Sequence, residues 1–516
     1  MAAAPATQPL RADSEPLSDS AAAAAAPVSA SGAPPLSACS SPAAAGDSPP
    51  PPPPKVSRRR WPCARGAASS LPRDAAHVGE SIAGAPPLRS AEGLTEGWLT
   101  AAFRHRGYLS PCGKVTEMTL RPLGEGLGSF GELVKVTVEV EGEMPHCPRR
   151  FVAKFAPQGE LQLPLFLVRQ TFLTETHFYH DFTVEEGGLV RPECYLAVAD
   201  PSKRQLTFCL LIEDMLPAVS YTRLQARPRP CTFARVAEAH SSPSAPRTLP
   251  PPSAAPTGGQ VLGALAGLHA RWWDNQKTKP LDWVPHPKDY GGAARHVWKL
   301  LIRRGFKHLP ACFGEVYQPV FSWRRAVLKH HDHIYRLLHQ HPLTLCHGDV
   351  HLDNVFFHER FPGGCALVDF GNMHLGQGLS DVAFFMATNI PVDARREHEH
   401  ALLKHYYQTL VNSGVSEESY SWDRCWREYR QQIWRPFVAI LTLSPSFAKQ
   451  KKLRSGMFAE SPSPGDASLL KMYTEFNKRL LAALLDHKWI ELVLPATEEV
   501  ERTVGCCQWR STGQKV

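Results

Sequence analysis

Small apolar residues alternate with polar ones over residues 133–140, which is the pattern of a strand with one buried face. Residues 151–155 predict a second short strand, and two more are expected at residues 193–198 and 206–212. Pro164 predicts the first turn of a helix between these strands, with apolar residues recurring along one side. The first half of the chain therefore predicts a small α+β lobe.

Helical spacing replaces the alternation from Gln260 onward. Apolar residues recur at three- and four-residue intervals after Gln260, one long helix is expected over residues 317–338, and residues 395–490 predict further amphipathic helices. Only residues 343–385 interrupt this pattern with short apolar strands. We therefore expect a second, larger lobe that is mainly helical.

Two segments lack any core pattern. Ala, Pro and Ser make up 39 of the first 54 residues, a composition too poor in large apolar side chains to offset the entropy of ordering. Globular patterning begins with a helix start expected at Ser90. The same bias returns later, either as an insertion between lobes or as a mis-spliced segment. The expected organisation is a disordered tail at 1–88, a first lobe at 89–225, a low-complexity insertion at 226–258, a second lobe at 259–495 and a tail at 496–516.

Composition narrows the cellular setting. The 13 cysteines include no C-x-x-C pair, which favours reduced thiols and a cytoplasmic location over a disulfide framework. No run of about 18 apolar residues occurs, so stable membrane insertion is not expected. The formal net charge is +8, and the basic run Arg58–Arg60 is more typical of a solvated tail than of a nucleic-acid site. No nucleic-acid partner is therefore expected, and protein partners stay unknown.

The segment after residue 343 carries the candidate chemistry. It reads H-G-D-x-x-x-x-N from His347 to Asn354, followed by an apolar hairpin that ends in Asp369-Phe-Gly. Phosphoryl transfer needs a base beside the attacking hydroxyl, oxygen ligands for Mg²⁺ and cations over the phosphates. Asp349 suits the base, and Asn354 and Asp369 supply the oxygen ligands. Either half could occur by chance, but both in this order favour a kinase site.

These motifs resemble the Brenner-type catalytic loop of aminoglycoside phosphotransferases and choline kinases. The resemblance is greatest to the ecdysteroid kinase-like branch, also called CHK kinase-like, and it extends from about residue 95 to residue 490. Three further segments carry it: Leu211-Ile-Glu-Asp-Met215, Leu268-His-Ala-Arg-Trp-Trp273 and Gly376–Phe385. The resemblance implies a bilobal protein-kinase-like α+β fold, with a small β-rich N-lobe and a larger, mainly helical C-lobe.

The resemblance also implies roles for the first lobe. Lys154 would be the cation over the α- and β-phosphates, and Glu175 on the following helix would hold it in place. A glycine-rich loop before the strand would let backbone amides approach the phosphates, through Gly126, Gly128 and Gly131.

The hinge-like segment would bind the adenine. Leu211, Ile212 and Met215 would form its apolar wall. Glu213 and Met215 would contact the base through their main chains. In the second lobe, His347 is expected to hydrogen-bond the loop backbone and hold Asp349. Asp381 is expected to anchor the same backbone or cap a helix.

We therefore expect an enzyme that uses ATP and Mg²⁺ to phosphorylate a hydroxyl group of a small molecule, such as a sterol, an amino alcohol or a xenobiotic. A pseudokinase or scaffold that binds nucleotide without turnover is the alternative. A protein kinase is disfavoured, because Gly376–Phe385 follows Asp369-Phe-Gly almost at once and leaves no room for an activation loop.

Overall fold

The computed structural model describes ten stretches of the chain besides the single residues 82 and 281. They are 84–123, 131–157, 165–182, 189–200, 207–220, 258–274, 283–289, 291–313, 317–457 and 464–494, with side chains left out at 165–168, 219 and 293 and in parts of the last two. The predicted tails and almost all of the predicted insertion lie outside them, so the domain bounds stay a prediction. Ile82 and Ala85 are nevertheless buried in the core of the first lobe, before its predicted start at residue 89.

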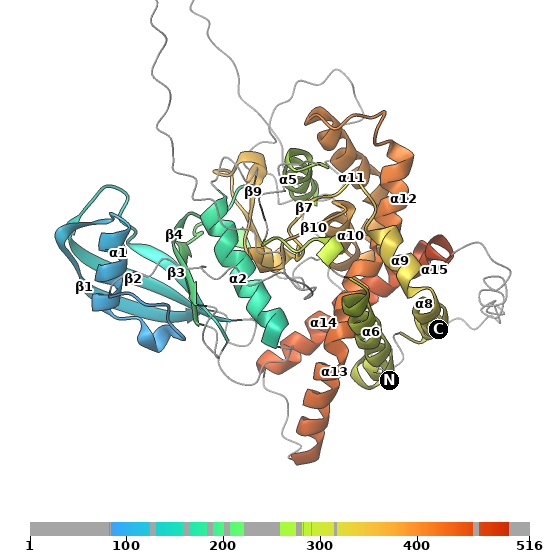
Figure 1. The fold of residues 1–516 in the computed structure, drawn as a ribbon, viewed down its shortest axis with the longest axis horizontal. Coiled ribbons are helices and arrows are strands. Elements are labelled where there is room, and N and C mark those ends of the chain that lie inside the picture. Colours follow the sequence, from blue (N-terminus) through green and yellow to red (C-terminus); the bar gives the residue numbers. More distant parts are fainter. Residues whose placement is uncertain are drawn as a thin grey trace, which may run out of the picture. The chain divides into compact units, whose positions relative to one another are not determined.

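The first lobe is a five-stranded antiparallel sheet in the order β1-β2-β3-β5-β4 (Figure 1). Its strands are β1 (Leu109–Leu123), β2 (Glu132–Glu143), β3 (Arg150–Phe155), β4 (Cys194–Asp200) and β5 (Thr207–Glu213). The strands predicted from alternation are confirmed. Helix α1 (Glu96–His105) packs against β1, and α2 (Leu165–Asp181) packs against β4.

Helix α1 begins later than predicted. Ser90 makes no capping hydrogen bond and precedes only the short 3₁₀ turn Ala91–Gly93. The Trp98 N–H instead donates to the Thr95 hydroxyl, so Thr95 is the N-cap of α1.

The second lobe is mainly helical, as predicted. Its helices are α5 (Gly258–Arg271), α6 (Gly292–Phe313), α7 (Gln318–Phe321), α8 (Arg324–Lys329), α9 (His331–Leu338), α10 (Leu379–Asn389), α11 (Val392–Asn412), α12 (Trp422–Gln432), α13 (Trp434–Met457), α14 (Pro464–Asp486) and α15 (Trp489–Val493). None of the helices in the described stretches is both long and apolar enough to cross a bilayer. Together with the sheet lobe, these helices confirm the bilobal α+β fold.

The prediction of one long helix over residues 317–338 is wrong, since the segment forms α7, α8 and α9. Val320, Val327 and Ile334 are all buried, and their seven-residue spacing suits one continuous helix equally well. The backbone of His330 leaves the helical region, with φ −96° and ψ 15°, and separates α8 from α9. Apolar periodicity could not reveal this break, because it preserves the buried face.

Short strands frame the catalytic segment. Strands β8 (Val355–Phe357) and β9 (Cys365–Leu367) form the predicted hairpin, and β6 (Val219–Ser220) pairs with β8. Strand β10 (His374–Gly376) pairs with β7 (Thr344–Cys346). The catalytic loop therefore runs between β7 and β8, and the Asp369-Phe-Gly segment runs between β9 and β10.

Candidate active site

Lys154 connects the two lobes. It lies on β3 between Ala153 and Phe155, whose side chains enter the core of the first lobe, so Lys154 faces the other side of the sheet. Its Nζ lies 2.8 Å from Glu175 Oε2 on α2 and 3.1 Å from Asp369 Oδ1. The predicted pairing of Lys154 with Glu175 is confirmed, and the contact with Asp369 adds a second carboxylate.

The charges in this group depend on one another. Burial lowers the pKa of Lys154, but Asp369 and Glu175 outweigh that effect and raise the pKa above its ordinary value. Burial raises the pKa of Asp369, yet Lys154 lowers it overall. Burial raises the pKa of Glu175 to about 7 although Lys154 opposes the change. Lys154 therefore stays charged, with Asp369 as its ionised partner.

Helix α2 also fixes the backbone around Asp369. Asp369 has a left-handed conformation with φ 66°, which costs a non-glycine residue about 1–2 kcal/mol. Phe370 stacks on Phe178 of α2 with ring centroids 3.9 Å apart. A Cβ on Gly371 would lie 2.4 Å from Thr171 Cγ2 on the same helix, so only glycine fits there. The helix that holds Glu175 thus also holds Asp369 in this strained conformation.

Asp349 is oriented by a residue that the sequence analysis missed. The side-chain amide of Asn372 donates to Asp349 Oδ2 at 3.2 Å. On the other side, His351 Nε2 lies 3.7 Å from Asp349 Oδ1. Asn372 directly follows Asp369-Phe-Gly, and only the pairing of β10 with β7 brings it beside the catalytic loop.

His347 joins the catalytic loop to the segment before Asp369, as predicted. Its Nε2 donates to the Val368 carbonyl at 3.0 Å, and its Nδ1 accepts the Asp349 N–H at 3.3 Å. Burial lowers the pKa of His347, which favours the neutral ring that these two bonds require. His347 therefore positions Asp349 and is not available as a second base.

Helix α10 forms the platform beneath the loop. Asp381 accepts the N–H groups of His347 at 2.6 Å and Gly348 at 2.9 Å, which confirms the predicted backbone anchor. Asn389 lies on the same helix and was not predicted. It accepts the Leu352 N–H at 3.0 Å and donates to the Val350 carbonyl at 3.3 Å. Two polar side chains of one helix thus hold both halves of the loop.

A buried histidine supports Asp381 from behind. His269 on α5 donates from Nε2 to Asp381 at 3.3 Å, while Tyr406 on α11 contacts its Nδ1 at 2.8 Å. Burial raises the pKa of Asp381, but the hydrogen bond from His269 outweighs it, and the pKa is lowered to about 2. Cys346 approaches His269 and Asp381, and together they offer donor atoms for a metal. Asp381 already accepts two backbone N–H groups, so a hydrogen-bonded network accounts for this cluster.

Asn354 is buried and is hydrogen-bonded to the residue before Asp369. Its amide donates to the Asp349 carbonyl at 3.0 Å, and its own carbonyl accepts the Val368 N–H at 3.0 Å. The hairpin of β8 and β9 therefore brings Asn354 beside Val368, the residue that precedes Asp369. Among the residues that the structure describes, no group donates to Asn354 Oδ1, which leaves an oxygen atom for a cation.

The hinge-like segment offers fewer groups for adenine binding than predicted. Leu211 lies in the core of the first lobe, on the face opposite Lys154, so the prediction that it forms part of an adenine wall is wrong. The Glu213 N–H donates to the carbonyl of Glu193, which directly precedes β4, and the Glu213 side chain pairs with Arg360 at 2.8 Å. The Met215 carbonyl accepts from Ala218 and Arg360. Within the described stretches, the Met215 N–H has no acceptor.

Of the glycine-rich loop, only its last residue can be placed. Gly126 and Gly128 lie outside the described residues. Gly131 has a φ of 130°, and a Cβ on it would lie 2.8 Å from the Phe155 carbonyl oxygen. This glycine is therefore required by the close approach of β2 and β3, whatever the loop binds.

Three solved structures share part of this architecture. A putative aminoglycoside phosphotransferase from Ralstonia eutropha JMP134 is 13% identical, covers 75% of this chain and 97% of its own, and has a TM-score of 0.40. Choline kinase from Cryptosporidium parvum Iowa II is 10% identical, with 75% and 96% covered and a TM-score of 0.39. An ethanolamine kinase from Plasmodium vivax is 11% identical, with 69% and 88% covered and a TM-score of 0.38. Scores below 0.5 at such identities carry no functional assignment.

The sequence comparisons are more specific. The search of curated proteins found no match. The model of the ecdysteroid kinase-like family matches residues 299–415, which include the catalytic loop, Asp369 and helix α10. The segment that contains the catalytic motifs thus matches the ecdysteroid kinase-like family, and the resemblance predicted from those motifs is confirmed.

Proposed function

We propose that the protein is a phosphotransferase that uses ATP and Mg²⁺ to phosphorylate a hydroxyl group of a small molecule. The observation that carries this proposal is the contact of Lys154 with both Glu175 and Asp369. Three motifs from distant parts of the chain converge there, in the pairing that kinases use to place phosphates and metal.

The residues fit a magnesium ion. Asp369 offers an ionised carboxylate, and Asn354 offers a side-chain oxygen without a described donor, which are the ligands that Mg²⁺ prefers. A bound Mg²⁺ would neutralise charge on the phosphate oxygens. Lys154 would add its positive charge over the α- and β-phosphates. The main-chain groups of Glu213 and Met215 would contact the adenine, with the Met215 N–H as the donor that remains.

Asp349 would act as the base. Its Oδ2 accepts from Asn372, which orients the carboxylate and leaves Oδ1 to take the proton of the acceptor hydroxyl. The hydroxyl oxygen would form a bond to the γ-phosphorus as the bond from phosphorus to the β–γ bridging oxygen breaks, and ADP would leave. His347 and Asn372 would position Asp349 without touching the reacting atoms.

The short path from Asp369 to α10 supports a small acceptor. After Asp369-Phe-Gly the chain enters β10, which pairs with β7, and α10 begins at Leu379. A protein kinase has a long activation loop here, which helps to bind the protein substrate. A screen of hydroxylated metabolites for ATP-dependent phosphorylation would identify the acceptor molecule.

The test compares two conservative changes in one loop. Asp349→Asn removes the base and keeps the shape, so we expect ATP–Mg²⁺ affinity within a few-fold of wild type and turnover lower by about 10²–10⁴. Asp353→Asn is the matched control, because Asp353 lies in the same loop, pairs with His351 at 3.3 Å and has no proposed role in the chemistry. Nucleotide binding is measured by calorimetry and turnover by ADP release. Equal loss of binding and turnover in Asp349→Asn would assign Asp349 a structural role.

A further inference from the structure

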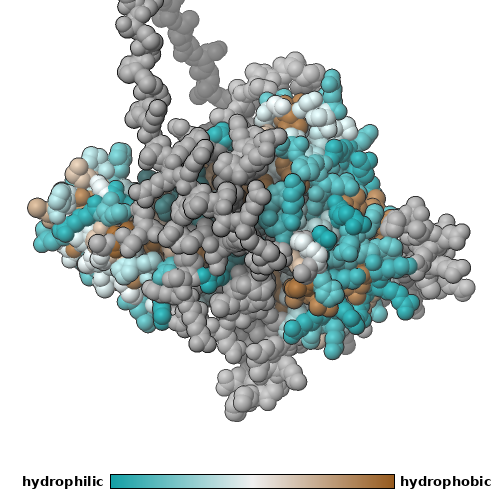
Figure 2. Space-filling view, in the orientation of Figure 1, coloured by the Kyte–Doolittle hydropathy of each residue, from teal (hydrophilic) through white to brown (hydrophobic). Residues whose placement is uncertain are grey.

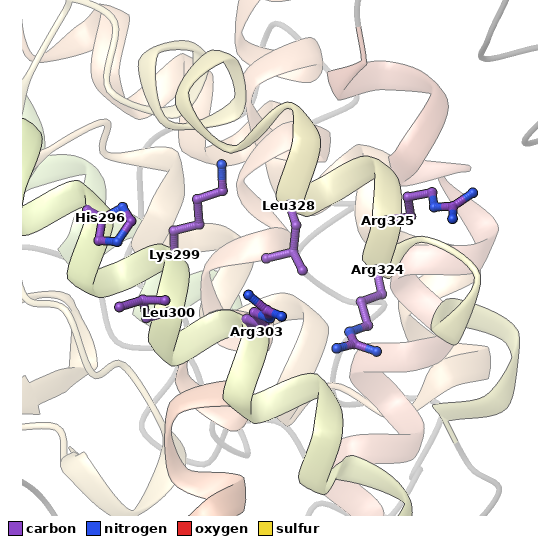
Figure 3. Close-up of a pocket in the computed structure, with 7 residues that line it drawn as sticks. All are labelled: His296, Lys299, Leu300, Arg303, Arg324, Arg325 and Leu328. Atoms are coloured by element: carbon purple, nitrogen blue, oxygen red, sulfur yellow. The ribbon is translucent and has the colours of Figure 1, made fainter.

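A basic pocket lies between α6 and α8, and it contains none of the residues proposed for phosphoryl transfer (Figure 3). Its cavity volume is about 420 Å³, within the usual range for small-ligand sites of about 300–1,000 Å³. The lining residues are His296, Lys299, Leu300 and Arg303 of α6 and Arg324, Arg325 and Leu328 of α8.

The pocket gathers positive charge without matching acids. None of its seven lining residues is acidic, and four of them are Lys or Arg. Among the described residues, no carboxylate lies within ion-pair distance of Arg303, Arg324 or Arg325. Lys299 helps to lower the pKa of Asp332, but Asp332 is exposed and pairs with His331 at 3.2 Å. A bound anion would therefore not compete with an internal ion pair for the arginines.

One arginine nitrogen is already desolvated. The Arg324 Nε is buried and contacts no acceptor within the described stretches. A buried donor without a partner is destabilising, and a ligand oxygen at this position would accept its hydrogen bond. In Figure 3, Arg303 and Leu328 lie between the two helices, Arg324 extends toward the same space, and Arg325 points away from α6. Arg303 and Arg324 thus form the centre of the pocket.

The surroundings favour a compact ligand. Leu300 of the lining and Val297 one turn away remain 47% and 48% exposed. Figure 2 shows mainly hydrophilic residues around small apolar spots on this side of the helical lobe, with no broad apolar face for a partner protein. Arginine forks bind phosphate oxygens in pairs, so Arg303 and Arg324 together match two phosphate groups better than one.

We propose that this pocket binds a soluble small anion that carries at least two phosphate groups. The site would bind such an anion without reacting with it, because no Ser, Thr, Cys or acidic side chain lines it. The proposal does not rest on the proposed function, since it uses no residue of the nucleotide site. Helix α6 packs along α13, whose Arg435 contacts His374 of β10. These contacts connect the pocket to the strand beside the catalytic loop.

The test uses inorganic tripolyphosphate as the probe. Calorimetry on the full chain in metal-free, low-salt buffer should show saturable binding that weakens as salt rises. The double change Arg303→Gln and Arg324→Gln keeps polarity but removes both central charges, and we expect the Kd to rise by at least about tenfold. Arg304→Gln is the matched control, because Arg304 is exposed on the same helix and does not line the pocket. It should change the Kd by less than about twofold.

Three results would overturn the proposal. These are no saturable binding to the wild type, equal weakening in the double variant and in Arg304→Gln, and no weakening in a double variant whose thermal unfolding matches wild type. Vesicles with anionic phospholipids distinguish the source of the phosphate. Sedimentation with vesicles that depends on Arg303, without tripolyphosphate binding, would assign the site to a membrane surface and refute a soluble ligand. Failure of the kinase assay leaves every one of these readouts unchanged.

Discussion

Asp381 offers the sharpest test of how the fold supports the catalytic loop. Its side chain is fully buried and accepts the N–H groups of His347 and Gly348 at 2.6 and 2.9 Å. Asp381→Ala would leave both donors buried without a partner. Asp381→Asn would keep one acceptor oxygen and present an N–H group to the second donor.

The loss of stability in each variant follows from the number of hydrogen bonds that it removes. A hydrogen bond to a charged group contributes about 1.5–3 kcal/mol, so Asp381→Ala should lower the free energy of unfolding by about 3–6 kcal/mol. That is a large part of the about 5–15 kcal/mol that stabilises a typical domain. Asp381→Asn loses one such bond and should cost about 1.5–3 kcal/mol. Loss of the contact from His269 adds to both values.

Low pH should reduce the difference in unfolding free energy between wild type and Asp381→Asn. The pKa of Asp381 is lowered to about 2 in the fold against an ordinary value of 3.8. A carboxylate with a lowered pKa stabilises the fold above its ordinary value and loses this contribution as the pH falls toward the folded value. The contribution is about 2 kcal/mol, so the gap in unfolding free energy should narrow below about pH 4.

Urea unfolding, followed by circular dichroism at several pH values, measures both effects. Asp393→Asn is the matched control, because the Asp393 side chain is 99% exposed and should change stability by less than about 0.5 kcal/mol. A loss below about 1 kcal/mol in Asp381→Asn at neutral pH would refute the anchoring role. A gap that stays constant from neutral pH to about pH 3 would refute the lowered pKa.

Two further changes probe the site. Lys154→Met should reduce turnover by about 10²-fold or more and weaken ATP binding, whereas Lys114→Met, at an exposed ion pair, should leave both unchanged; equal kinetics would contradict the proposed phosphate contact. Gly348→Ala should cost more than about 3 kcal/mol, because its φ is 85° and the new Cβ would lie 2.1 Å from the Asn372 carbonyl. Gly363→Ala has φ 78° and open space around it, so thermal unfolding should show only about 1 kcal/mol, and equal losses would exclude the clash.

The catalytic loop could be predicted because its chemistry is local. The spacing from Asp349 to Asn354 and the hairpin that leads to Asp369 are written in one stretch of sequence, and the structure keeps that arrangement. Asn372 and Asn389 could not be predicted in the same way. Each contacts the loop only after β10 or α10 has packed in place, and neither lies in a pattern that marks a polar residue as functional.

The hinge-like segment shows the opposite limit. Leu211 belongs to an apolar run whose sequence suits a wall for adenine, but strand alternation assigns each residue to one face or the other. Leu210 is the cross-strand partner of Lys154, so Leu210 shares its face and Leu211 points into the core of the lobe. A resemblance in sequence identified the segment, but only the register showed which side chains face the site.

Helix α10 explains why so much of the second lobe is needed for one loop. All of its residues are buried, and a helix buried on every side is expected to be apolar. Asp381 and Asn389 are exceptions because their polar groups hold the loop backbone. The end of the helix is held in turn by Arg479 of α14, which donates to the Asn389 carbonyl at 2.8 Å. A rigid loop therefore requires a buried polar helix, and that helix requires the surrounding lobe to satisfy its own terminus.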